Sequence, residues 1–247
     1  VDCSLIIITA GANQKPSETR LDLVHKNVSI LKSIIPEITR RGCEGLLLIV
    51  SNPVDILTYA AYRISGFPSS RVFGSGTVLD SARFRYLLSE HLSVDTESIH
   101  AFIIGEHGDS ELAVWSGTNV AGIPIHDFCE FRGHYRHTDA MEAIYSQEKN
   151  SAYDIIDRKG ATYYGIAMAI GHITESIIRN KNSILPVSSL LTGQYGLKDL
   201  YLSIPTIVNR NGAQQPLEIP LSGQEHLALQ KSARTLKEII QSLDFSV

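Results

Sequence analysis

The chain has 247 residues, of which 43% are apolar and 19% are charged, and it carries a formal net charge of −4. This composition fits a globular protein of one large or two smaller domains, and the slight negative charge offers no basic field for nucleic acid or an anionic membrane. No apolar run reaches the length of a membrane span, and the first residues lack a secretory signal pattern. Cys3, Cys43 and Cys129 are widely spaced, which favours neither a disulfide framework nor a zinc site. We expect a cytoplasmic protein without nucleic-acid or membrane partners.

The first elements alternate between strands and helices. The apolar run at 4–10 predicts a buried strand, and helical spacing of apolar residues begins at Leu21 after a polar loop. A second strand is expected at 46–50, ending at Ser51-Asn52-Pro53, and a second helix at 54–64. Two successive β-loop-α units indicate a doubly wound parallel sheet, in which ligand-binding residues gather at the carboxyl ends of the strands. Gln14 and Asn52 both follow such ends.

The pattern changes after Gly66-Phe67-Pro68. We expect a strand at 72–73, a helix at 80–92 and a strand at 100–104, then helices at 139–159 and 161–180. Three β-rich stretches at 184–192, 200–208 and 216–220 precede a final helix at 223–243. The predicted fold class is α/β. Residues 1–74 would form the C-terminal half of a doubly wound (Rossmann) domain, and residues 75–247 an α+β substrate domain.

Single residues with possible chemistry each have an ordinary structural explanation. Arg20 and Arg83 could be solvated helix residues, Asp80 could cap a helix, and Asn52 precedes Pro53 as in a common turn. The run Glu106-His107-Gly108-Asp109 could supply metal ligands. No second histidine lies at a metal-site spacing, however, so we expect no metal.

Five motifs that follow one another along the chain give these residues a common functional explanation. They are Ala-Gly-Ala-Asn-Gln-Lys-Pro-Ser-Glu-Thr-Arg at 10–20, Ile-Val-Ser-Asn-Pro-Val-Asp at 49–55, Gly-Ser-Gly-Thr-Val-Leu-Asp-Ser-Ala-Arg-Phe-Arg at 74–85, Ile-Gly-Glu-His-Gly-Asp-Ser at 104–110 and Lys-Gly-Ala-Thr-Tyr-Tyr-Gly-Ile-Ala at 159–167. Together they resemble the signatures of bacterial-type L-lactate dehydrogenases in the lactate/malate dehydrogenase family. The resemblance implies reversible hydride transfer between NADH and pyruvate to give L-lactate, the last step of anaerobic glycolysis.

The resemblance also assigns catalytic roles. His107 matches the proton donor, and Asp80 matches the carboxylate that orients the imidazole and favours its charged form. Arg83 matches the residue that grips the substrate carboxylate, for which a planar guanidinium is well suited. Arg20 matches a mobile-loop arginine that polarises the substrate carbonyl.

Further residues match binding positions of the family. Asn52 corresponds to a hydrogen-bonding residue near the carbonyl and the nicotinamide, Thr162 to a substrate-pocket wall, and Ser75 and Ile166 to nicotinamide contacts. Gln14 stands where the related malate dehydrogenases have arginine. A second substrate carboxylate against a neutral amide would remain unpaired, so we expect pyruvate rather than oxaloacetate.

Regulation and assembly are implied more weakly. Arg85 and His100 match residues with which many bacterial members bind fructose 1,6-bisphosphate at a subunit interface, although an ion-pair role at an interface or surface is an equal alternative. The family implies a homotetramer.

The glycine-rich phosphate loop with which the family begins is absent from this sequence, so we expect that about 80 or more N-terminal residues are missing. The chain as given would then keep the substrate-site residues but lack independent activity. Two alternatives stay open: a malate dehydrogenase-like 2-hydroxy acid dehydrogenase, and a non-catalytic truncated chain or pseudoenzyme.

Overall fold

The computed structural model describes residues 3–12, 20–133, 137–159 and 162–245. The chain begins with alternating strands and helices, which are β1 (Leu5–Ile8), α1 (Arg20–Arg40), β2 (Leu46–Ile49), α2 (Val54–Ser65) and β3 (Val72–Gly74). β1 pairs in parallel with β2, and β2 pairs in parallel with β3. All four residues of β2 are buried, as expected for a parallel strand covered on both faces. The predicted β-loop-α units and their parallel sheet are confirmed.

Segments from late in the chain extend this sheet. Its order is β1-β2-β3-β10-β11, and β10 (Ser188–Thr192) lies antiparallel to both β3 and β11 (Lys198–Ser203). One apolar core joins the two parts, because Ile49 and Leu57 belong to the same buried cluster as Leu200 and Leu229. The sheet and its core therefore extend across the expected boundary at residue 74/75, which stays a prediction.

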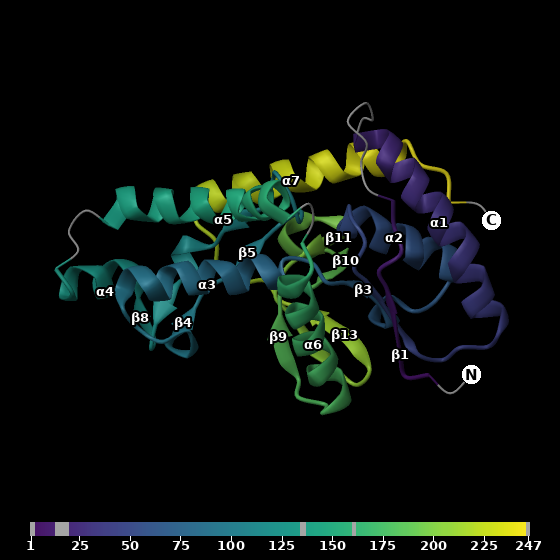
Figure 1. The fold of residues 1–247 in the computed structure, drawn as a ribbon, viewed down its shortest axis with the longest axis horizontal. Helices are drawn as coiled ribbons and strands as arrows, with labels where there is room; N and C mark the ends of the chain where they lie inside the picture. The colour runs from purple at the N-terminus through teal and green to yellow at the C-terminus, as the bar shows by residue number, and fades with distance from the viewer. Residues whose placement is uncertain (1–2, 13–19, 134–136, 160–161, 246–247) are drawn as a thin grey trace.

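The middle of the chain forms an arm at one end of the molecule, in which α3 (Val78–Leu92) and α5 (His137–Lys159) lie side by side (Figure 1). Residues Phe84 and Leu88 of α3 pack in a second buried cluster with Ile103 and Ile144. The remaining elements of the arm are short: β4 (Ile99–His100), β5 (Ile103–Ile104), β6 (Leu112–Ala113), β7 (Asn119–Val120), β8 (Ile123–Pro124) and α4 (Ile125–Phe131).

Between the arm and the large sheet, α6 (Tyr164–Ile178) packs on a three-stranded antiparallel sheet of order β13-β12-β9. These strands are β9 (Ser183–Leu185), β12 (Thr206–Asn209) and β13 (Gly212–Pro216). The last helix, α7 (Gly223–Gln241), begins with a capping box in which Ser222 and Glu225 satisfy each other's backbone N–H groups. It runs along one side of the molecule from the arm toward α1 (Figure 1).

Two sequence predictions are wrong. The expected strand at 100–104 consists of two separate strands, because β4 pairs with β7 whereas β5 pairs with β6. Of the expected β-rich stretch at 216–220, only Pro216 belongs to a strand, as the last residue of β13, and residues 217–220 lie outside any strand. Proline has no N–H to donate to a continued ladder. The short strands β6 to β8 and the helix α4 were not predicted, because two-residue strands carry no readable periodicity.

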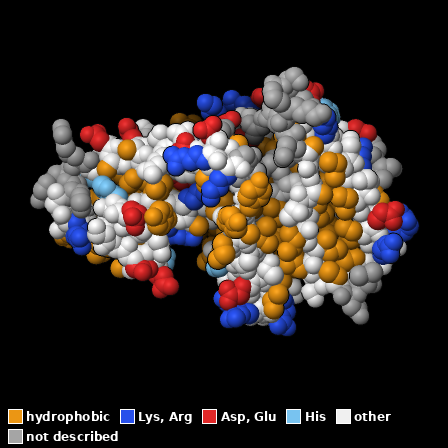
Figure 2. Space-filling view, viewed as in Figure 1, with side chains coloured by type: hydrophobic (Ala, Val, Ile, Leu, Met, Phe, Trp, Pro, Cys, Tyr) orange, Lys and Arg blue, Asp and Glu red, His pale blue; other side chains and the backbone are white. Residues whose placement is uncertain are grey.

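Exposed hydrophobic side chains gather over β1 and α6 (Figure 2). They include Ile7 at 40% exposure, Tyr164 at 78% and Met168 at 76%. Within the described residues β1 is an edge strand that pairs only with β2. No helix in the described part of the chain is long and apolar enough to cross a membrane.

The junction between β13 and the segment before β3 gives a stability prediction. Gly212 has φ of 93°, and a Cβ there would lie 2.0 Å from the Ser70 carbonyl oxygen. Gly212→Ala should therefore lower the free energy of unfolding by about 2 kcal/mol or more in urea denaturation. Gly171→Ala in α6 is the matched control, because its Cβ would meet nothing within 4 Å, and alanine there should stabilise by up to about 1 kcal/mol. Equal destabilisation by both substitutions would contradict the steric requirement assigned to Gly212.

Candidate active site

The loops after β1 and β2 are held together by a buried amide. Asn27 of α1, which is 1% exposed, accepts a hydrogen bond from the Ala12 N–H and donates one to the Asn52 carbonyl, both at 2.7 Å. The Ser51 hydroxyl adds a 2.6 Å hydrogen bond to the Ala10 carbonyl. Asn27 was not predicted from the sequence, although its position in the apolar stripe of α1, between Val24 and Val28, was a readable signal.

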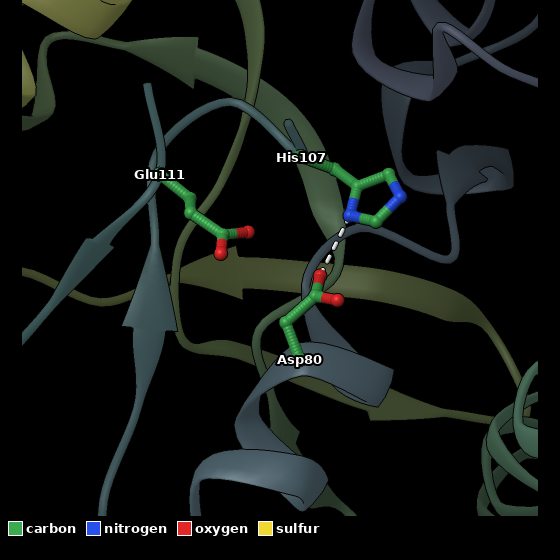
Figure 3. Close-up of side chains that lie close together, drawn as sticks. All are labelled: Asp80, His107 and Glu111. Carbon is green, nitrogen blue, oxygen red and sulfur yellow. Dashed lines mark hydrogen bonds and ion pairs between the residues drawn. The ribbon is translucent and has the colours of Figure 1, made fainter. Parts of the chain in front are cut away.

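An imidazole and a carboxylate meet at the centre of the site (Figure 3). Asp80 lies in the first turn of α3, and His107 lies in the loop after β5. The distance between His107 Nδ1 and Asp80 Oδ2 is 2.6 Å. An ionised carboxylate can only accept a hydrogen bond, so Nδ1 carries the donated proton and Nε2 is left for a ligand. The structure thus brings these two sequence-predicted residues into direct contact.

A second carboxylate fixes the backbone of the His107 loop. Asp55 of α2 is 1% exposed and accepts hydrogen bonds from the His107 backbone N–H at 2.8 Å and from the Ser188 and Ser203 hydroxyls at 2.5 and 3.2 Å. Burial raises the pKa of Asp55, and the three hydrogen bonds oppose this shift. No role was predicted for Asp55 from the sequence, although a charged residue inside the apolar run from Val54 to Ala61 was a visible signal.

The charge state of His107 follows from these neighbours. Burial of the ring disfavours its charged form, but the Asp80 carboxylate outweighs this through its charge and its hydrogen bond, and Asp55 adds to the effect. Despite the opposing charge of Arg83, the net result raises the pKa of His107 to about 9. At neutral pH the ring is therefore an imidazolium that can donate a proton from Nε2.

Arg83 lies next to this pair. It projects from α3 one turn after Asp80, and its Nη1 atom is 3.6 Å from Asp80 Oδ1. Its side chain is 17% exposed and lines two adjoining cavities, of about 770 and 570 Å³. A guanidinium in this position can hold a carboxylate beside the imidazolium.

The larger cavity also contains four other predicted site residues. It is lined by Asn52, Ser75, Thr162 and Ile166, together with Arg83 and His107. Ser75 is 4% exposed, and its N–H is bonded to the Ile49 carbonyl at the end of β2. The strand ends and α6 thus bring residues together that lie more than 100 positions apart in the sequence.

Four further predicted residues are not among those that line the cavity in the described part of the chain. Gln14 falls outside the described residues, and of Arg20 only the backbone, at the start of α1, is described. Arg85 donates a 3.4 Å hydrogen bond to the Ala101 carbonyl, next to His100, which is exposed on β4. Burial lowers the pKa of Arg85.

One group of side chains could hold a cation. Ligand atoms of Asp80, His107 and Glu111 all lie within 4.8 Å of one another (Figure 3). However, His107 Nδ1 already donates to Asp80, so a metal at that nitrogen would have to displace the proton. The expectation of no metal stays a prediction.

Comparison with known proteins agrees with this geometry. Family models match residues 1–74 as the NAD binding domain and residues 77–245 as the alpha/beta C-terminal domain of lactate/malate dehydrogenase. The L-lactate dehydrogenase of Acetivibrio thermocellus is 55% identical, with 98% of this chain and 78% of that protein covered. L-lactate dehydrogenase 1 of Clostridium acetobutylicum is 54% identical, with 97% and 76% covered.

A solved structure extends the likeness to the fold. The ligand-bound minor L-lactate dehydrogenase from Enterococcus mundtii has a TM-score of 0.95 at 43% identity and covers 99% of this chain and 78% of its own. A site that pairs a protonated imidazole with a guanidinium able to bind a carboxylate suits reduction of a 2-oxo acid. The chain therefore belongs to the lactate/malate dehydrogenase family, and within it to the NAD-dependent L-lactate dehydrogenases.

Proposed function

We propose that pyruvate is reduced to L-lactate, and L-lactate oxidised to pyruvate, in the cavity between the strand ends and α6. The observation that carries this proposal is the 2.6 Å contact between His107 Nδ1 and Asp80 Oδ2, with Arg83 beside it. In the pyruvate direction, His107 donates the Nε2 proton to the developing alkoxide. In the lactate direction the neutral ring takes that proton back.

The cavity walls suit the nicotinamide end of NAD. Val50, Leu79 and Ile170 offer apolar surface, while Asn52 and the buried Ser75 offer polar groups, which is the mixture that a flat ring bearing an amide requires. We assign Asn52, Ser75 and Ile166 to this end of the cofactor. When bound, NAD supplies or accepts the hydride, which no side chain can do.

Substrate positioning falls to Arg83 and Thr162. The guanidinium of Arg83 is largely buried, so its two parallel hydrogen bonds to a carboxylate would form away from bulk water and would fix the substrate orientation. Thr162 would close one wall of the pocket. We further propose from the motif at 10–20 that Arg20 polarises the carbonyl and that Gln14 selects pyruvate.

We also propose two features of the assembled protein. Arg85 and His100 would bind fructose 1,6-bisphosphate between subunits of a homotetramer, where cations repeated across a two-fold axis suit a bisphosphate. The support is the hydrogen bond from Arg85 to the Ala101 carbonyl, because Ala101 directly follows His100 at the end of β4. The three cysteines are free thiols, which agrees with a cytoplasmic location.

The charge of His107 predicts the pH dependence. A raised pKa keeps the ring protonated below about pH 9, so kcat/KM for pyruvate should fall as the pH rises through about 9, whereas kcat/KM for lactate should rise over the same range. Asp80→Asn removes the charge that favours the imidazolium and should shift both transitions toward pH 6.5. A pH profile that is unchanged in Asp80→Asn would contradict the role given to Asp80.

The proton-donor role of His107 gives a separate test. His107→Ala should lower kcat about 10³-fold. Replacement of His25, an exposed histidine on α1, by alanine is the control and should leave kcat unchanged.

Substrate choice gives a second test. Gln14→Arg supplies a partner for a second carboxylate, so the ratio of kcat/KM for oxaloacetate to that for pyruvate should rise at least about tenfold. Gln14→Leu is the control, because it alters the side chain without adding a charge. A parent protein that already prefers oxaloacetate would contradict the role given to Gln14.

The effector site is tested by pyruvate saturation curves with and without fructose 1,6-bisphosphate. We expect the effector to lower KM for pyruvate and to promote tetramers, and we expect Arg85→Gln and His100→Gln each to abolish both effects. Fructose 6-phosphate, which lacks the second phosphate, is the control ligand. No change in KM or in sedimentation would remove this proposal.

A further inference from the structure

A serine of the last helix contacts the loop that carries His107. Ser232 lies in the middle of α7 and is 0% exposed, and its neighbours Leu229 and Ala233 belong to the apolar core. A hydroxyl buried in such surroundings is unfavourable unless it forms hydrogen bonds. The function proposed above assigns no role to this serine.

The Ser232 hydroxyl contacts two residues of the loop. Its Oγ accepts a 2.8 Å hydrogen bond from the backbone N–H of Glu106, the residue immediately before His107. The same Oγ lies 2.9 Å from Ser110 Oγ, on the other side of the loop. A single hydroxyl from 126 positions away in the sequence therefore joins the two sides of the loop.

The number of available protons fixes the direction of these bonds. The Ser110 hydroxyl donates its one proton to the Glu106 carboxylate, so Ser110 can only accept in its contact with Ser232. Ser232 therefore donates to Ser110 and accepts from the Glu106 N–H. The three residues form a closed ring of hydrogen bonds, which runs from the Glu106 backbone through both hydroxyls to the Glu106 side chain.

This ring spans the base of the loop. The loop connects the paired strands β5 and β6, with Glu106 near its beginning and Ser110 near its end. Gly105 has φ of 97°, and a Cβ there would lie 3.1 Å from Ser232 Oγ. The helix thus approaches the loop backbone closely at the residue where the loop begins.

The residues before and after Glu106 are held by other elements. Gly105 and Ser203 of β11 exchange two backbone hydrogen bonds, of 2.8 and 3.1 Å. The His107 N–H donates a 2.8 Å hydrogen bond to Asp55 of α2. Three successive residues of the loop are therefore fixed by three elements that are distant in the sequence, and such a backbone restricts where the imidazole can lie.

We propose that Ser232 is a positioning residue for the proton donor: its ring of hydrogen bonds with Glu106 and Ser110 holds the loop where the His107 ring meets Asp80. The inference rests on the role proposed for His107. Ser232 acts through the backbone of Glu106, one residue before the histidine. It thereby makes α7 a part of the catalytic architecture, in addition to its place in the core.

Removal of the hydroxyl tests this role. Ser232→Ala leaves the Glu106 N–H without its acceptor, so the loop should relax and displace the His107 ring. We expect kcat for pyruvate reduction to fall about tenfold or more. KM for pyruvate should change by less than about twofold, because Arg83 lies on α3 and not on the loop. A weaker contact between His107 and Asp80 should also move the fall in kcat/KM to lower pH.

The matched control lies on the same helix. The Thr235 hydroxyl bonds the carbonyl of Lys231, also on α7, so Thr235→Ala removes a helix hydroxyl without touching the loop. It should leave kcat, KM and the pH profile unchanged. A loss of kcat that Thr235→Ala shares with Ser232→Ala would point to a general effect on α7 and would overturn the inference.

A double-mutant cycle tests the ring itself. Ser232→Ala and Ser110→Ala each open the same ring, so the double variant should be about as slow as the slower single variant. Independent losses that multiply in the double variant would contradict the ring. In a His107→Ala background, Ser232→Ala should cause no further loss of kcat, because a positioning residue acts only through the residue that it positions. A further loss there would also overturn the inference.

Folding is checked by thermal melting of each variant. Ser232→Cys keeps a side chain of similar size with a weaker acceptor, so it should show an intermediate fall in kcat and provides the test if Ser232→Ala does not fold. Folded Ser232 variants that keep the parent kcat and pH profile overturn this inference alone. A His107→Ala variant with the parent kcat instead overturns the role of His107.

Discussion

The arrangement of the site depends on the buried Asp55 carboxylate. Its two oxygens accept hydrogen bonds from the backbone N–H of His107 and from the hydroxyls of Ser188 and Ser203, and so connect α2 to the His107 loop, to β10 and to β11. These partners are separated by up to 148 positions in sequence. A buried carboxylate is costly unless such bonds satisfy it. The same bonds therefore join the early and late parts of the sheet and fix the His107 loop.

The charges at the centre of the site are close together. The Arg83 guanidinium and the His107 ring both lie beside the Asp80 carboxylate. In the proposed function, a substrate carboxylate bound to Arg83 would add one negative charge, and this charge would favour the imidazolium form of His107. Binding of the substrate anion and protonation of His107 would then be coupled through electrostatics.

The sequence predicted the strands and turns that depend on neighbouring residues, and the site residues that belong to the family motifs. Apolar runs located β1 and β2, and the Asn52-Pro53 turn located the start of α2, because strand burial and turn chemistry act over a few residues. The family motifs also brought His107, Asp80 and Arg83 together as one site. Asp55 was not predicted as a site residue, because its charge inside an apolar run is visible in the sequence but the partners that give it a role come from distant segments. The break between β4 and β5 was also not predicted, because it depends on which distant strand each segment pairs with.

The loops of the substrate site also depend on distant contacts. Asn27 holds both the chain at Ala12 and the carbonyl of Asn52, so the segment that leads to Gln14 starts from a point fixed relative to the site. Because Asn27 lies on α1, which begins at Arg20, the helix that holds the Ala12 N–H also holds the Asn52 carbonyl, and α1 thereby fixes the ends of β1 and β2 relative to each other.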